Sequence, residues 1–151
     1  MQHRILEAMR KDKRKGRVFL LQSKNPACFA RLLNGLPQNV VLMTTIETNR
    51  DSICAEVSKA PLPSLRFQDF LHLDWPRKAL VMEPILDFDL DVIVEWVTKL
   101  KPETIMIGSA SKGRRNLPEP SHLKVLELHK ELQGLGFKTY DKKDFKYLNV
   151  F

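Results

Sequence analysis

Residues 78–110, KALVMEPILDFDLDVIVEWVTKLKPETIMIGSA, decide the fold of the chain. An apolar run (78–84) leads into a segment (90–101) whose apolar residues recur at helical spacing, and a second apolar run follows at 103–110. Short apolar runs joined by a helical crossover are typical of parallel strands that are buried on both faces. The stretch therefore predicts a strand, a helix and a second strand parallel to the first.

The same alternation extends along the rest of the chain, which predicts a single α/β domain over residues 1–151 with a parallel βα-repeat sheet of about five strands. The AP-LP segment at 60–63 excludes one long helix in the crossover that follows the second strand, and a shorter helix is expected there from about Ser64 to Leu71. The remaining strands are predicted at 17–23, 39–49 and 137–141, and the remaining helices at 1–16, 25–35 and 119–136.

Length and composition describe an ordinary globular protein. Of the 151 residues, 43% are hydrophobic and 28% are charged, which is enough apolar material for one core. No stretch approaches the roughly 18 consecutive apolar residues of a membrane span. Since the first residues, MQHRILEAMRKDKRKGR, also contain no apolar signal core, we expect a cytoplasmic protein that does not enter a membrane.

The net charge of +7 is concentrated near the start of the chain, in RKDKRKGR at residues 10–17. A cationic last turn suits the end of a helix, and Gly16 is expected as its left-handed cap. The alternative interpretation is a patch that contacts phosphate groups of a nucleic acid. The first interpretation is favoured, because charge runs are usually solvated helix surfaces.

Polar side chains follow the predicted strands. Right-handed crossovers place the carboxyl ends of parallel strands at one edge of the sheet, where barrels and open α/β sheets bind ligands. This edge is therefore the predicted site. Its candidate residues are Lys24, Asn25, Glu47, Thr48, Asn49, Arg50, Glu83, Asp87, Ser109 and Lys112.

For each candidate residue, a purely structural role is the alternative to a role in ligand binding. Asn25 and Asp89 occupy N-cap positions, and Asp91 lies in a first helical turn, where the helix dipole favours a carboxylate. Glu47 and Glu83 directly follow apolar strands and cannot be simple caps. A carboxylate at such a place needs a partner, which a nearby lysine or arginine could supply without any ligand.

Several catalytic and metal-binding motifs are absent from the sequence. Gly108 and Gly113 have the glycine spacing of a P-loop, but two arginines follow where Lys-Ser/Thr is required. Cys28 and Cys54 match no metal or disulfide pattern and are predicted to be free thiols. His122 and His129 lack further ligands at suitable spacing, so surface or groove positions are expected, and no metal site is predicted.

Five motifs taken in order resemble the later part of radical S-adenosylmethionine proteins, in particular spore-photoproduct-lyase-like and phage-type members. They are FLLQSKNP, VVLMTTIETNRD, SKAP, ALVMEPILDFDLD and TIMIGSASKGRRNLPEPS, within about 17–144. The resemblance implies a partial (half) TIM-type barrel that begins at the third strand of the family's barrel. It also implies that S-adenosylmethionine is contacted by Lys24, Glu47, Thr48, Asn49, Arg50, Glu83 and Ser109, with Asp87 and Lys112 near substrate.

The chain departs from this family in one respect. Members hold a [4Fe–4S] cluster with three cysteines in a Cx3Cx2C loop, whereas this sequence has only Cys28 and Cys54, 26 residues apart. The resemblance therefore implies a truncated or split-gene half-enzyme. Its cluster would come from a partner polypeptide that docks at the open sheet edge beside residues 17–23. No reductive cleavage is expected from this chain alone.

Two other functions stay open at this stage. The chain could be a non-catalytic module that binds a nucleotide or nucleic acid through its basic residues, closing its own sheet edge as a homodimer. Nucleic-acid binding of this kind falls steeply with salt, which would distinguish it. The chain could also be a degenerate remnant with no activity of its own.

Overall fold

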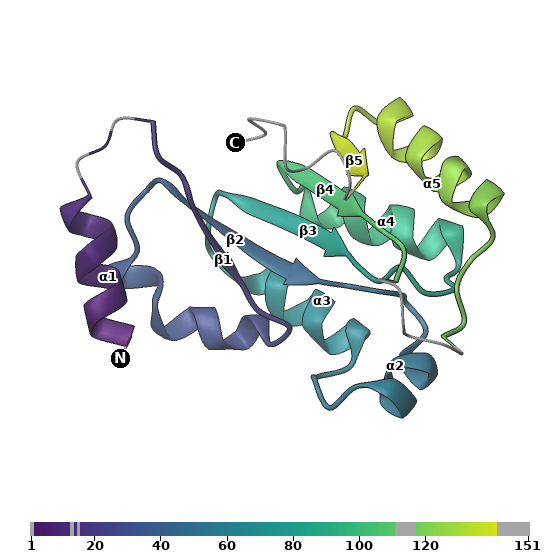
Figure 1. Cartoon of the computed structure of the whole chain (residues 1–151), viewed down its shortest axis with the longest axis horizontal. Coiled ribbons are helices and arrows are strands. Elements are labelled where there is room, and N and C mark those ends of the chain that lie inside the picture. Colours follow the sequence, from purple (N-terminus) through teal and green to yellow (C-terminus); the bar gives the residue numbers. More distant parts are fainter. Residues whose placement is uncertain (1, 13, 15, 111–116, 142–151) are drawn as a thin grey trace.

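The computed structural model describes residues 2–12, 14, 16–110 and 117–141, and for residues 2–5 only the backbone. Five parallel strands form one sheet in the order β1-β2-β3-β4-β5, so every strand lies beside its neighbour in the sequence (Figure 1). This confirms the predicted parallel α/β sheet. The strands are β1 (Phe19–Gln22), β2 (Val40–Thr45), β3 (Lys78–Met82), β4 (Thr104–Ile107) and β5 (Thr139–Asp141).

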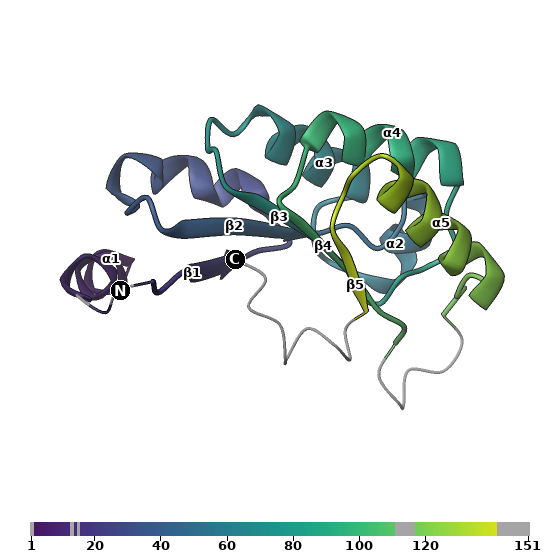
Figure 2. The same ribbon diagram turned by 90° about the horizontal axis from the view of Figure 1, so that it is seen from above.

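The helices between the strands cover one side of the sheet only (Figure 2). A sequential strand order with helices on a single side is the arrangement of a partial βα barrel, whereas a doubly wound sheet carries helices on both sides. The elements are α1 (Gln2–Lys11), η1 (Pro26–Arg31), η2 (Leu33–Gly35), α2 (Asp51–Val57), α3 (Pro63–His72), α4 (Leu90–Leu100) and α5 (His122–Gly134), where η denotes a 3-10 helix.

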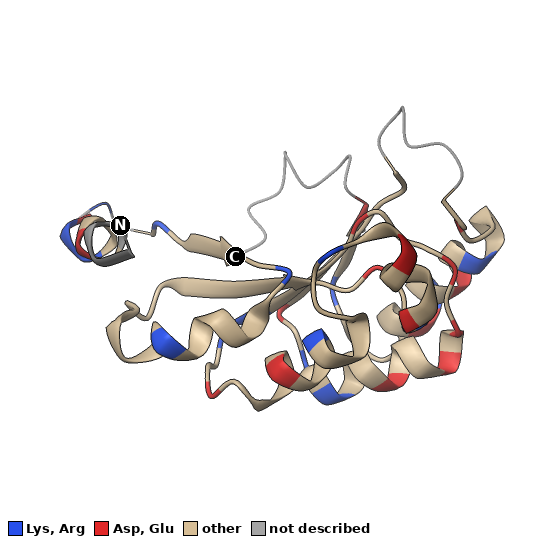
Figure 3. Ribbon diagram, turned by 90° about the horizontal axis from the view of Figure 1, so that it is seen from below, with Lys and Arg blue, Asp and Glu red and all other residues tan. Residues whose placement is uncertain are grey.

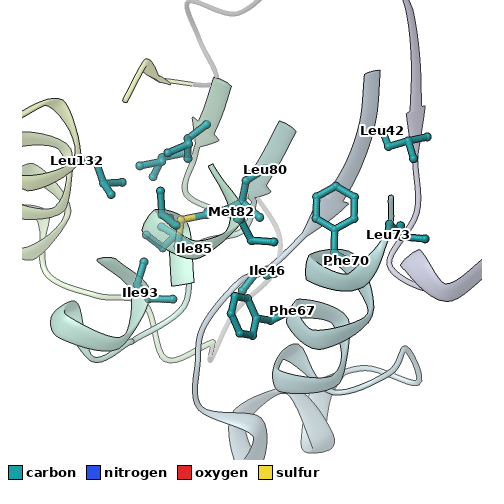
Figure 4. Packing of buried hydrophobic residues seen from close by; sticks show 14 of the residues in the cluster. Leu42, Ile46, Phe67, Phe70, Leu73, Leu80, Met82, Ile85, Ile93 and Leu132 are labelled. Atoms are coloured by element: carbon teal, nitrogen blue, oxygen red, sulfur yellow. The ribbon is translucent and has the colours of Figure 1, made fainter. Parts of the chain in front are cut away.

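The main hydrophobic core lies between the sheet and these helices. Phe67 and Phe70 of α3 pack beside Ile46, while Met82 lies near Ile85 under α4 (Figure 4). Because side chains alternate along a strand, the intervening residues of β2 and β3 point to the opposite side. There they form a second, smaller buried cluster of Val41, Met43, Ala79 and Val81. Both central strands are thus buried on both faces.

Several local predictions are confirmed. The crossover helix expected at 64–71 is α3, and the residues from 90 to 100 form α4. Cys28 and Cys54 are free thiols. Beyond these predictions, both tryptophans pack against the main core: Trp96 stacks on Phe67 with ring centroids 4.5 Å apart, and Trp75 Nε1 donates to Val40 O over 3.0 Å.

Three local predictions are wrong in detail. Residues 26–35 form two short 3-10 helices instead of one α-helix, and the Asn25 side chain makes no capping hydrogen bond. The crossover before α3 contains an additional helix, α2. The first helix ends at Lys11, so Gly16, although its φ is +74°, is not the cap of that helix. Apolar spacing indicates that a helical segment is present, but it does not fix where the segment begins and ends or whether its turns are 3-10 or α-helical.

Candidate functional site

The carboxyl ends of the strands bring most of the predicted site residues to one edge, where they form two charged clusters. We define the Glu47 cluster as Lys24, Glu47 and Arg66, and the Asp87 cluster as Arg50, Asp87, Asp89 and Lys124. Elsewhere, most charged residues lie on the helices and on the connecting loops, while the ribbon of β2 carries none (Figure 3).

The Glu47 cluster begins two residues beyond the end of β2. Lys24, which follows β1, forms an ion pair with Glu47 Oε1. Arg66 of α3 lies on the other side, with Nη1 2.7 Å from Glu47 Oε2. Nη1 also donates to Thr45 O over 2.6 Å. Glu47 Oε2 has no aligned hydrogen-bond donor among the described residues, so its contact with Arg66 is electrostatic.

Burial distinguishes the members of the Glu47 cluster. The side chain of Arg66 is 0% exposed and that of Glu47 is 4% exposed, whereas Lys24 is 40% exposed. A buried carboxylate and guanidinium each require the other, because neither charge can be solvated. Lys24 alone can exchange its partner for a ligand. The Lys24 ammonium, which pairs with Glu47 Oε1, is consequently the most solvated charge of the Glu47 cluster.

Arg66 also contacts the thiol of Cys54. Its Nη2 lies 3.8 Å from Cys54 Sγ. Burial, and after it the negative charge of Glu47, raises the pKa of this thiol. Cys54 is therefore protonated at neutral pH and is suited to packing rather than to nucleophilic or metal chemistry.

The Asp87 cluster joins the loop after β2 to the loop after β3. Arg50 holds Asp89 with two nitrogens, Nη2 to Oδ1 at 2.6 Å and Nε to Oδ2 at 3.2 Å, and its Nη1 pairs with Asp87. Lys124 of α5 donates to Asp87 Oδ1 over 2.7 Å. Asn49 exchanges two hydrogen bonds with Asp89, both 2.8 Å long. Asp89 therefore starts α4, as predicted, but its carboxylate binds Asn49 and Arg50 and does not cap the helix.

These carboxylates are held in the ionised state. The hydrogen bond from Lys124, followed by the positive charges of Lys124 and Arg50, lowers the pKa of Asp87. Hydrogen bonds from Arg50 and Asn49 lower the pKa of Asp89 to about 2. A carboxylate with a lowered pKa is a poor proton donor at neutral pH. The Asp87 cluster thus serves to hold two loops together, and it offers no general acid.

The remaining predicted residues are spread along the same edge. The Thr48 hydroxyl is buried and donates to Asp87 O over 2.6 Å, so it is part of the loop connection. Glu83 follows β3 and is half-buried, and its peptide bond to Pro84 is cis. Ser109 follows β4 and is exposed. Lys112, with the rejected P-loop segment around Gly113, lies outside the described residues.

The sequence interpretation missed Arg66, Lys124 and a cavity. Arg66 lies on the apolar face of α3 between Pro63 and Phe70, and an arginine within an apolar stripe was the available signal. The cavity has a volume of about 330 Å³ and lies between the end of β4 and α5. His122 and His129 line it, which confirms that these histidines lie in a groove.

Fold and site together define an α/β protein built on a partial βα barrel with a charged carboxyl edge. No family model matches the chain, and no curated protein or solved structure matches it. Within the described residues, no helix is long and apolar enough to cross a membrane. Over the same residues, no three His, Cys, Asp or Glu side chains are grouped so that they could hold a metal ion.

Proposed function

We propose that this chain forms part of a larger βα barrel and that its carboxyl edge contributes to a site for S-adenosylmethionine and a substrate. The sequential five-stranded sheet with helices on one side carries this proposal. A closed βα barrel of the TIM type needs eight parallel strands, so the five strands of the described residues leave room for strands from another polypeptide. We choose S-adenosylmethionine as the ligand because the sequence motifs resemble those of radical S-adenosylmethionine proteins.

The Glu47 cluster supports a ligand of this chemistry. The amino-acid end of S-adenosylmethionine carries one ammonium and one carboxylate, which complement Glu47 and Lys24 respectively. Lys24 is 40% exposed and can turn away from Glu47 when the ligand arrives. Arg66, with Nη1 2.7 Å from Glu47 Oε2, holds the carboxylate in place meanwhile. The proposed contacts therefore centre on Lys24 and Glu47, with Glu83 and Ser109 further along the edge.

The proposed roles of the other candidates are narrower. Thr48 and Arg50 contact Asp87, and Asn49 contacts Asp89, so all of these residues connect the two loops. Their contribution would be to fix the loop that carries Glu47, because Leu86 N also donates to Glu47 O over 2.8 Å. A direct contact between these residues and the ligand is not needed for the proposal.

The iron–sulfur cluster does not fit this chain. A [4Fe–4S] cluster of the family requires three thiolates from one loop, and the sequence contains only Cys28 and Cys54. Cys54 is buried against Arg66, and Cys28 Sγ lies 3.5 Å from Ser23 Oγ. We therefore propose that a partner polypeptide supplies the cluster and docks beside β1, which is an edge strand of the described sheet.

Isothermal titration with S-adenosylmethionine tests the binding half of this proposal. The wild-type chain should bind, and Lys24→Met should weaken binding by about tenfold, the effect expected of one lost charged contact. Lys99→Met is the matched control, because Lys99 forms an exposed ion pair with Glu95 on α4. A folded wild-type chain that releases no heat, or equal effects of the two substitutions, would contradict the proposal.

Nucleic-acid binding is the competing outcome, and the basic residues 10–17 can be tested for it. Part of their charge is already paired: Asp12 forms ion pairs with Arg14 and Arg17, at 2.6 and 3.0 Å. Fluorescence anisotropy with a labelled DNA duplex would measure the affinity for nucleic acid at about 50 and 200 mM salt. A loss of affinity of more than about a hundredfold between these concentrations would favour the nucleic-acid module.

A further inference from the structure

The side of the sheet that faces away from the connecting helices is apolar, and we call it the open face (Figure 2). Residues that are paired across parallel strands share a face, because side chains alternate along each strand. The register therefore assigns seven residues to the open face: Leu20, Val41, Met43, Ala79, Val81, Met106 and Tyr140. None of these seven residues is charged.

The centre of the open face is buried. The four residues that form it are at most 3% exposed: Val41, Met43, Ala79 and Val81. Among the described residues, the further apolar side chains that pack against them are Val18, which directly precedes β1, and Met106 of β4. Both lie in the same layer as the four. Since a single layer of side chains leaves its outer surface open to water, this burial requires a second layer.

The described helices do not supply this second layer. The helices that connect the strands lie on the other side of the sheet (Figure 2). Helix α1 packs through Leu6 and Met9 against the main core and not against the open face. The cover of the open face therefore has to be sought outside the described residues.

One segment outside the described residues has the composition of an apolar cover. Residues 111–116, SKGRRN, include no apolar side chain, and positions 13 and 15 are lysines. Residues 142–151, KKDFKYLNVF, begin with charged residues and continue with a mostly apolar stretch. Its apolar side chains are Phe145, Tyr147, Leu148, Val150 and Phe151. Apolar side chains of this number can bury a sheet face, whereas the other segments cannot.

The segment 142–151 also starts at a suitable place and is long enough. It follows Asp141, the last residue of β5, which is an edge strand of the described sheet. Neighbouring strands are about 4.8 Å apart, so β2 lies about 14 Å from β5. An extended chain of this length spans up to about 33 Å. Leu20 on β1, one strand further away, is 41% exposed, so the cover is needed over β2 to β4 and not over β1.

We propose that residues 142–151 fold back over the open face and that their apolar side chains pack against Met43, Val81 and Met106. The segment thereby controls access to the sheet, because another chain can reach the open face only after the segment has left it. Uncovered apolar surfaces of this kind bind partner chains or cause aggregation. The proposal does not rest on the function proposed above, since none of the open-face residues is assigned to the S-adenosylmethionine site.

The methionines and phenylalanines of the chain are placed so that they can report this contact. Met43 and Met106 lie on the open face, whereas Met82 lies in the main core. The chain has eight phenylalanines, and the six described ones all belong to the main core or pack against it: Phe19, Phe29, Phe67, Phe70, Phe88 and Phe137. A phenylalanine ring that contacts Met43 is therefore expected to be Phe145 or Phe151.

Nuclear Overhauser effects (NOEs) between these groups test the proposal in the full chain. The sample carries ¹³C-labelled methionine methyl groups and protonated phenylalanine, with deuterium elsewhere. The methyl group of Met43 or Met106 should show NOEs to phenylalanine rings. Phe145→Leu/Phe151→Leu keeps the segment apolar but removes its rings, so these NOEs should be lost while the Met82 signal keeps its position. Their absence from the wild type, or their persistence in the variant, would overturn the proposal.

A mixed sample distinguishes the chain's own segment from a second copy of the chain. One copy carries the labelled methionines with deuterated phenylalanine, and the other carries protonated phenylalanine with unlabelled methionine. An equimolar mixture should show no NOE from Met43 or Met106 to phenylalanine. If NOEs of the strength seen in the wild type appear in the mixture, a second copy covers the open face and the proposal is wrong.

Serine substitutions test whether the segment controls access to the open face. Phe145→Ser/Phe151→Ser should increase the fluorescence of the apolar dye ANS, which binds exposed hydrophobic surface. The matched control Leu65→Ser/Leu123→Ser removes two side chains that are already 53% and 76% exposed, and it should not increase the fluorescence. Thermal melts show whether both variants are folded. Equal fluorescence of the two folded variants would contradict the proposal, and if one variant unfolds, the NOEs of the wild type decide.

Discussion

The Glu47 cluster and the Asp87 cluster lie at the same edge of the sheet and are built from the same kinds of side chain, yet they differ in burial. Arg66 and Glu47 are at most 4% exposed, whereas Arg50, Asp87 and Asp89 are between 32% and 48% exposed. Both clusters pair carboxylates with guanidinium groups. Contact geometry alone therefore does not decide what a charged cluster contributes to the protein.

Burial changes the consequence of losing a partner. In the Glu47 cluster, removal of one charge leaves the other without solvent, and that penalty is several kcal/mol. In the Asp87 cluster, water replaces the lost partner, and the penalty is at most about 1 kcal/mol per pair. We therefore assign an essential structural role to the Glu47–Arg66 pair and a loop-fastening role to the Asp87 cluster.

Arg66→Met should have the largest effect. It leaves Glu47 buried beside Lys24 alone, and the free energy of unfolding should fall by about 3–5 kcal/mol. Urea denaturation measures this fall. The double variant Glu47→Gln/Arg66→Met removes both charges and should be at least about 1 kcal/mol more stable than Arg66→Met. If the two variants are equally stable, the unpaired charge is not the cause.

Asp87→Asn should have a smaller effect. It weakens the contacts with Arg50 and Lys124, and the expected loss is about 1 kcal/mol, because all three side chains are partly solvated. The loss should shrink in about 1 M NaCl, where the screening length is about 3 Å. The loss from Arg66→Met should persist at that salt concentration. If salt reduced the loss of stability equally in Asp87→Asn and Arg66→Met, burial would not distinguish the two clusters.

The Asp87 cluster should also contribute to acid unfolding. Asp89 has a pKa of about 2 in the folded chain, and the pKa of Asp87 is lowered too, whereas unfolded aspartate titrates near 3.9. Groups with a lowered pKa stabilise the fold above the unfolded pKa, and this stabilisation is lost as the pH falls through the folded pKa. Thermal melts between pH 5 and pH 2 should therefore show a smaller decrease for Asp87→Asn/Asp89→Asn than for the wild type. An identical decrease would contradict the lowered pKa values.

Lys99→Ala should have the smallest effect. Lys99 and Glu95 form an exposed i,i+4 pair on α4, with side chains that are 53% and 57% exposed. Such helix pairs contribute about 0.3–0.5 kcal/mol. Urea denaturation should give this variant a free energy of unfolding that is lower than that of the wild type by about 0.3–0.5 kcal/mol. If the free energy of unfolding fell as much as it does for Asp87→Asn, solvent exposure would not determine how strongly an ion pair of this chain stabilises the fold.

The strands, their parallel direction and the edge at which the polar residues gather could all be predicted from the sequence. These properties follow from short apolar runs, from crossovers of helical period and from the direction in which each strand ends. Glu47 and Glu83 could be selected for the same reason, since each lies within two residues of the end of a strand. Periodicity is a local property, and it is therefore readable along the chain.

Which charges meet and which of them are buried could not be predicted from the sequence, because both depend on long-range packing. Arg66 lies 19 residues after Glu47 in the sequence, and Lys124 lies 37 residues after Asp87, so no local pattern connects either pair. Nor could the cavity between β4 and α5 be read from the sequence, because its walls come from separate segments that the fold brings together. Long-range packing sets burial, and burial sets the energetics of every charge at this edge.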